Sequence, residues 1–180
     1  MRRMTPLQRA TLLVLSASTL VQADLVNFET PQVYPLALSP DGSTLALCNT
    51  VDHRVELFGL ASGTPVRLAS VPVGMDPVTV RFRTDGELWA VNQLSDSVSV
   101  IDLASLVVVK TLATADEPAD VVFAGNPLKA YVSCSQADVV QVFDAVSPDI
   151  PLKTIAIEGE DPRALAVSGD GTKVYVAVVA

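Results

Sequence analysis

The stretch Leu88-Trp-Ala-Val-Asn-Gln-Leu-Ser-Asp-Ser-Val-Ser-Val-Ile-Asp102 holds two short apolar runs, residues 88–91 and 98–101, separated by a polar turn. Valine, isoleucine and aromatic residues favour strands, and runs of this length match the strands of globular proteins. Asp102 ends the second run, where its carboxylate can accept hydrogen bonds from the backbone N–H groups of the following turn. The stretch therefore predicts two consecutive strands.

Versions of this pattern recur before and after it. A proline precedes an apolar run at spacings of 42, 41 and 44 residues, a tight-turn pair recurs at spacings of 44, 41 and 44, and the residue that ends the third run recurs at spacings of 43 and 42. These landmarks are Pro35, Pro77, Pro118 and Pro162; the pairs that begin at Asp41, Asp85, Asn126 and Asp170; and Gly59, Asp102 and Asp144. A period of about 42 residues with four short strands is typical of β-propeller blades.

We therefore expect an all-β chain built from four-stranded antiparallel blades. After a lead-in at 24–32, the blades are predicted at 33–74, 75–115 and 116–159, and the first half of a fourth at 160–180. A blade needs neighbours on both faces and a closed ring. We interpret the sequence as an N-terminal fragment of about three and a half blades of a longer propeller. The alternative is a ring closed by two half-propellers in a dimer.

The first 23 residues differ from the rest of the chain. Arg2, Arg3 and Arg9 precede or flank an uncharged run at 10–20, and Val21-Gln22-Ala23 fits a small-x-small cleavage pattern. This pattern predicts a bacterial signal peptide cut between Ala23 and Asp24, and hence a periplasmic or extracellular protein. The alternative is a retained membrane anchor, but a run of about 11 residues is too short to span a bilayer.

The charge of the mature chain limits its partners. Removal of residues 1–23 takes away three of the 12 basic residues and none of the 20 acidic ones, which leaves a net charge of −11. Nucleic acids and anionic membranes are bound mainly through Lys and Arg, so neither is an expected partner. Cys48 and Cys134 lie in different predicted blades, and we expect buried free thiols; a disulfide is the alternative that export would permit.

With these residues in view, the chain resembles the YVTN-type β-propeller repeat family over roughly residues 33–180. The matching segments are Ser39-Pro-Asp-Gly42, Leu88-Trp-Ala-Val-Asn92, Ser97-Val-Ser-Val-Ile-Asp102 and Val174-Tyr-Val-Ala177. The chain departs from the family pattern at Gly59, Asn126-Pro127, Cys134 and Val178. The resemblance implies an extracytoplasmic propeller, commonly seven-bladed, whose innermost strand follows the proline. Related propellers include lactonases and quinoprotein-like or cytochrome-linked proteins, so the fold alone does not assign a function.

Acidic residues stand beside the repeat prolines. Asp76, Glu117 and Asp161 directly precede three of them, and Asp120 and Arg163 follow closely. If the proline-led strand is innermost, as the resemblance implies, these loops ring one mouth of a central channel. We predict ligand-binding loops there, with Asp76, Glu117 and Asp161 as candidate ligands of Ca²⁺ or of a basic ligand. The alternative is a set of solvated turn residues.

Other residues that could carry chemistry have no partner visible in the sequence. His53, the only histidine, lies in a predicted turn without a recognisable acid–base partner. Trp89, Tyr131 and Tyr175 occupy equivalent repeat positions and are expected in the core. Because no catalytic motif is visible, we predict an exported scaffold that presents loops to a protein or small-molecule partner. The alternative is the N-terminal part of a propeller enzyme, lactonase-like or linked to a cytochrome.

Overall fold

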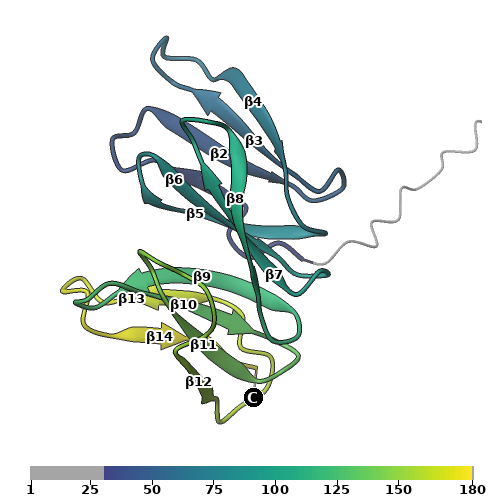
Figure 1. Ribbon diagram of the computed structural model, residues 1–180, viewed down its shortest axis with the longest axis vertical. Helices are drawn as coiled ribbons and strands as arrows, with labels where there is room; N and C mark the ends of the chain where they lie inside the picture. The colour runs from purple at the N-terminus through teal and green to yellow at the C-terminus, as the bar shows by residue number, and fades with distance from the viewer. Residues whose placement is uncertain (1–30, 180) are drawn as a thin grey trace, which may run out of the picture.

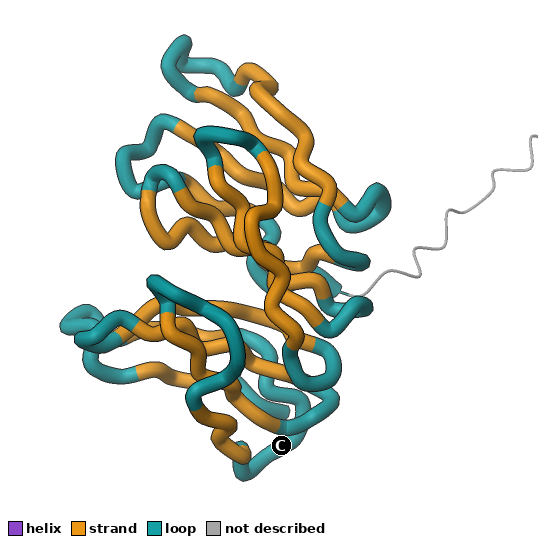
Figure 2. The backbone as a smooth tube through the Cα atoms, viewed as in Figure 1, coloured by secondary structure: helices purple, strands orange, loops and turns teal. Residues whose placement is uncertain are grey.

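The computed structural model describes residues 31–179, so the predicted signal peptide and its cleavage site lie outside the described residues. These residues form three four-stranded antiparallel sheets and one two-stranded sheet (Figures 1 and 2). The all-β, four-stranded repeat predicted from the sequence is confirmed. Within this part of the chain, no helix is long and apolar enough to cross a membrane.

The opening stretch forms the two central strands of the second sheet. This sheet has the order β5-β6-β7-β8, with β5 at Pro77–Thr84, β6 at Glu87–Asn92, β7 at Ser97–Asp102 and β8 at Val107–Ala113. Strands β6 and β7 pair from Glu87↔Asp102 to Asn92↔Ser97 without a register shift. The Asp102 carboxylate accepts the Ser105 N–H at 2.8 Å, as expected for a turn fixed by the residue that ends the strand.

The other sheets repeat this arrangement. The first contains β1 (Leu36–Leu38), β2 (Thr44–Asn49), β3 (Arg54–Gly59) and β4 (Val66–Pro72). The third contains β9 (Pro118–Ala124), β10 (Lys129–Cys134), β11 (Val139–Asp144) and β12 (Lys153–Ala156). The last pairs β13 (Leu165–Val167) with β14 (Val174–Val176). Gly42 and Gly171 take φ values of +70° and +69° in the tight turns, where a Cβ would be strained.

The first strands of successive sheets lie side by side. Strands β1, β5, β9 and β13 contact one another in chain order, and Tyr34 forms a parallel bridge with Thr79. In Figure 1 the sheets follow one another along the long axis, with β2–β4 at one end and β9–β14 at the other. The sheets therefore meet along their proline-led strands, and the N-terminal ends of these strands lie on one face of the molecule.

The core consists of layers between neighbouring sheets. One layer holds Trp89, which is fully buried and meets Phe123 edge-on with ring centroids 5.2 Å apart. Tyr131 is partly buried against the layer between the third and fourth sheets, whereas Tyr175 is 57% exposed. The expected core position is thus confirmed for Trp89 and wrong for Tyr175, because no further sheet within residues 31–179 packs over Tyr175.

The two cysteines lie in different layers. Cys48 packs between the first and second sheets and Cys134 between the second and third, and both are free thiols. Burial raises the pKa of each thiol to about 12, because the thiolate would lose its hydration. The thiols therefore act as small apolar core groups, and the alternative disulfide is not formed.

Candidate functional site

The acidic residues before the repeat prolines share an uncommon backbone conformation. Asp76, Glu117 and Asp161 have φ values of 52°, 52° and 51°. Left-handed φ is adopted by only a few per cent of non-glycine residues. Its repetition at one position of successive sheets shows that the loops before β5, β9 and β13 are built alike. We call the face that carries these loops the proline-loop face.

A second set of left-handed residues holds these loops in place. His53, Asp96 and Asp138 lie in the turns before the third strands of their sheets, with φ values of 55°, 46° and 51°. The side chain of each accepts the N–H of the acidic residue before the next proline, at 3.1, 2.9 and 3.0 Å respectively. Their carbonyl groups accept a second N–H from the loop, from Val73, Thr114 and Ile157. We call each such pair of hydrogen bonds a loop clamp.

The clamped loops are also bonded to the next sheet. The Asp76 carbonyl accepts the Gln93 N–H at 2.9 Å, and the Glu117 carbonyl accepts the Ser135 N–H at 2.8 Å. The loops before β5 and β9 are therefore bonded on one side to a turn of the preceding sheet and on the other side to the equivalent turn of the following sheet. This double attachment fixes the direction of the backbone on the proline-loop face.

A side-chain network joins three of these elements. Gln93 donates from Nε2 to Glu117 Oε2 at 3.1 Å, and its Oε1 accepts from Arg163 Nη2 at 3.4 Å. Arg163 Nη1 lies 3.5 Å from Asp161 Oδ1, and its Nη2 also donates to the Pro31 carbonyl. The structure thus brings together Glu117, Asp161 and Arg163, which the sequence had singled out. Gln93, which is only 2% exposed, connects them and was missed by the sequence reasoning.

Asp76 has a different environment. Its carboxylate lies 3.6 Å from His53 Nδ1 and its side chain is 12% exposed, against 44% for His53. It reaches the Gln93 network only through its backbone carbonyl. His53 lies in a turn, as expected, and the structure adds that its Nδ1 is the acceptor in the first loop clamp. The signal that could have revealed this is its alignment with Asp96 and Asp138 in the repeat.

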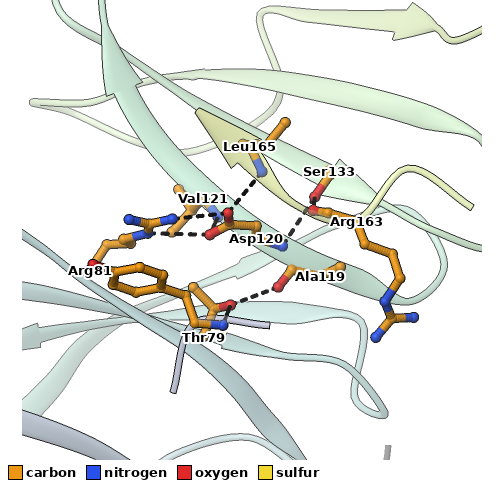
Figure 3. Close-up of polar contacts among 9 residues, drawn as sticks. Thr79, Arg81, Ala119, Asp120, Val121, Ser133, Arg163 and Leu165 are labelled. Atoms are coloured by element: carbon orange, nitrogen blue, oxygen red, sulfur yellow. Dashed lines mark hydrogen bonds and ion pairs between the residues drawn. The ribbon is translucent and has the colours of Figure 1, made fainter. Parts of the chain in front are cut away.

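Asp120 does not lie in a binding loop. It belongs to strand β9, is 1% exposed, and pairs with Arg81 Nη2 at 3.0 Å (Figure 3). Its two oxygens also accept the N–H groups of Val121 and Leu165 at 2.8 and 2.9 Å. Burial raises the pKa of Asp120, and the Arg81 guanidinium opposes that rise. The expected place of Asp120 in a loop beside the proline is corrected: it lies in a buried strand, and its carboxylate joins strands β5, β9 and β13.

Other polar contacts extend this seam between the inner strands. Thr79 Oγ1 donates to the Ala119 carbonyl at 2.8 Å, and the Ser133 hydroxyl donates to the Arg163 carbonyl (Figure 3). Arg81 stacks on the ring of Tyr34, with its guanidinium carbon 3.5 Å from the ring centroid. A guanidinium over an aromatic face is attracted by the ring quadrupole, so this contact adds to the ion pair with Asp120. We call this group of contacts the inner seam, and its role is to join the sheets.

The proline-loop face is polar and slightly hollowed between the third and fourth sheets. A hollow of about 330 Å³ is lined by Ser135, Gln136, Asp138, Glu160 and Asp161. Within residues 31–179, no three His, Cys, Asp or Glu side chains are grouped so that they could hold a metal ion. Asp76, Glu117 and Asp161 therefore do not form a calcium ligand set here. The face presents a fixed array of hydrogen-bond donors and acceptors.

Comparison with known proteins supports the fold. No family model matches the sequence, and no curated protein matches it. Among solved structures, the hydrazine synthase of Kuenenia stuttgartiensis is similar over 88% of this chain and 45% of its own, with 26% identity and a TM-score of 0.74. A "putative 6-phosphogluconolactonase" from Bacteroides uniformis is similar over 78% of this chain and 48% of its own, with 20% identity and a TM-score of 0.68.

A third solved structure shows the same relation. A functionally unknown protein from Desulfotomaculum acetoxidans is similar over 79% of this chain and 48% of its own, with 17% identity and a TM-score of 0.68. The chain thus spans about half the length of the solved structures it matches. The repeated four-stranded sheets and these likenesses together show that the chain has a propeller-like fold related to the hydrazine synthase and lactonase structures.

Proposed function

We propose that this chain is part of an exported propeller-like scaffold that binds a protein or small-molecule partner at the proline-loop face. The observation that carries the proposal is the Gln93 network. It connects the turn after β6, the loop before β9 and the segment before β13, so three successive sheets contribute to one polar surface. Clamped backbones and buried Gln93 give this surface a fixed geometry before any ligand arrives, which lowers the entropic cost of binding.

The charges of the face indicate the kind of ligand. Glu117 and Asp161 supply carboxylates, and the hollow beside them adds Asp138 and Glu160. Arg163, the cation of the network, is already paired with Asp161. An acidic face favours a ligand with basic or other hydrogen-bond-donating groups, and charge-assisted hydrogen bonds to carboxylates are stronger than neutral ones. A basic peptide segment of a protein partner has this chemistry.

Calorimetric titration of the full-length protein with a short lysine-rich peptide tests the proposal. The Glu117→Gln variant removes one carboxylate without changing the side-chain shape, and it is expected to weaken binding by about tenfold, the effect of losing one charge-assisted hydrogen bond. Asp149→Asn is the matched control, because Asp149 is 79% exposed and its contact is with Lys110 of another sheet. Equal affinities for Glu117→Gln and the parent protein would contradict the proposal.

Export is tested separately. The signal-peptide pattern at residues 1–23 supports it, and mass spectrometry of protein from a periplasmic or culture fraction should find a mature chain that starts at Asp24. A chain that retains Met1 in the cytoplasmic fraction would contradict it.

A second candidate function is a part in an enzyme. It is favoured by the likeness to the Kuenenia stuttgartiensis hydrazine synthase, which covers most of this chain at 26% identity. A redox-linked propeller is expected to be purified with a coloured partner or domain. A visible absorption band that co-purifies with the full-length protein would support this candidate, and a colourless protein that still binds the basic peptide would favour the scaffold.

A further inference from the structure

The three loop clamps differ in one chemical property. Two of them use an aspartate, Asp96 or Asp138, to accept the N–H of the following loop, whereas the first uses His53 Nδ1. Among ordinary side chains, only imidazole is expected to change its charge between pH 5 and 8. The first loop clamp is therefore the one of the three whose acceptor is an imidazole nitrogen, and a proton on that nitrogen would abolish the hydrogen bond.

The geometry fixes which form of His53 makes the clamp. Nδ1 accepts the Asp76 N–H at 3.1 Å, so this nitrogen must be unprotonated and the ring proton must lie on Nε2. A proton on Nδ1 would place two N–H groups against each other. The same nitrogen lies 3.6 Å from Asp76 Oδ1. After a small rotation of the ring, this oxygen can accept a hydrogen bond from the protonated Nδ1.

The other charged groups near His53 are already engaged. On its own turn, Asp52 accepts from Asn49 Nδ2 at 2.8 Å, and Arg54 donates to the Ser70 hydroxyl at 2.7 Å. From the packed loop, Asp76 is the charged residue that faces the ring. Because His53 is 44% exposed, a proton reaches it from solvent without opening of the fold.

We propose that His53 is a pH-sensitive switch in which protonation moves its Nδ1 contact from the Asp76 amide to the Asp76 carboxylate and loosens the loop before β5. The freed loop is connected to the Gln93 network through the Asp76 carbonyl, which accepts a hydrogen bond from the Gln93 N–H at 2.9 Å. Loosening of this loop is expected to shift the Gln93 side chain and its hydrogen bonds with the side chains of Glu117 and Arg163. The backbone amides of Glu117 and Asp161 stay bonded to Asp96 and Asp138. The link to ligand binding rests on the proposed function, whereas the switch itself does not.

Hydrogen exchange of the full-length protein, measured by mass spectrometry at pH 7.5 and 5.5 and corrected for the intrinsic rate, tests the switch. Peptides that contain the Asp76 amide should exchange several-fold faster at pH 5.5, up to about tenfold, the effect of one lost hydrogen bond. Peptides that contain the Glu117 and Asp161 amides are internal controls, because aspartates hold these amides, and they should not change. An unchanged rate at Asp76 overturns the proposal.

Two variants make the test specific. His53→Asp installs the acceptor used by the other clamps, so the pH response at Asp76 should disappear while the amide stays protected at both pH values. Asp138→His places imidazole in the third clamp and should create a new pH response at the Asp161 amide. Persistence of the Asp76 response in His53→Asp would refute the switch. Because exchange is measured without ligand, a failure of the switch is distinguished from a failure of the proposed binding function.

Discussion

Replacement of Asp120 by alanine is expected to destabilise the fold strongly, because four donor atoms lose their acceptor at once. Arg81 reaches the carboxylate through Nε at 3.3 Å and Nη2 at 3.0 Å, and the backbone N–H groups of Val121 and Leu165 complete the set. Removing one partner of a buried ion pair costs about 3–5 kcal/mol, since the other charge remains desolvated. We therefore expect Asp120→Ala to lower the free energy of unfolding by at least about 3 kcal/mol.

Urea unfolding followed by tryptophan fluorescence measures this loss. Trp89 is the one tryptophan of the chain and lies fully buried between the second and third sheets, next to the inner seam. Asp120→Asn retains one carbonyl oxygen and should cost less, about 1–3 kcal/mol. Asp149→Ala removes an exposed ion pair with Lys110 and should cost about 1 kcal/mol or less. If Asp120→Ala falls in the range of Asp149→Ala, the seam does not hold the sheets together.

The pH dependence of an Arg81 variant checks the electrostatic part of the argument. Burial raises the pKa of Asp120 above its ordinary value, and Arg81 limits that rise. In Arg81→Gln the pKa of Asp120 should rise further, so the folded state favours the protonated Asp120 carboxyl. A raised carboxyl pKa contributes stability that is present at low pH and is lost as pH rises through the folded pKa. The destabilisation caused by Arg81→Gln should therefore shrink as pH falls from 7 to 5; a constant difference would contradict this account.

Three further predictions concern other parts of the chain. Gly74→Ala should lower the free energy of unfolding by about 1–3 kcal/mol, because the added Cβ would lie 2.7 Å from Asn92 Cγ. Thermal unfolding measures this loss of stability. The pKa of Asp170 is lowered to about 2 by donors that include the Ser168 hydroxyl, so its contribution to stability is present above pH 4 and is lost as pH falls through about 2. Ser168→Ala should raise that pKa, as followed by carboxyl NMR titration. Finally, Cys48 and Cys134 are buried free thiols, so iodoacetamide should modify them only after denaturation. Mass spectrometry counts the modified cysteines in the native and the denatured protein.

The repeat could be predicted from the sequence because each of its markers has a local physical cause. Alternating apolar residues fix the strands, and tight-turn pairs fix the hairpins, so the expected run at 88–91 lies within β6 at Glu87–Asn92. The contacts between sheets could not be predicted in the same way. Arg81 and Asp120 are 39 residues apart in the chain, and only the rotation of one sheet relative to the next brings them together. Asp120 was therefore expected in a loop although it lies in a buried strand.

The candidate site was predicted in part. The residues before the prolines were identified, and Glu117, Asp161 and Arg163 do meet, but the left-handed backbone that positions them has no unique sequence signal in non-glycine residues. Gln93 was missed because a glutamine in a polar turn is ordinary, and its burial becomes visible only with the neighbouring sheets in place. His53 was missed because it differs from the aspartates at the equivalent positions.

The carboxylates of the inner seam and of the proline-loop face differ in how many of their hydrogen-bond acceptor positions are still free. An ionised carboxylate can accept about four hydrogen bonds. Asp120 already accepts four, so a ligand could bind there only by displacing contacts between sheets. Glu117 accepts from Gln93 and Ser135 through Oε2, which leaves Oε1 without a donor among residues 31–179. Two acidic residues three positions apart thus have opposite roles, and a ligand is expected at the one whose acceptors are not yet used.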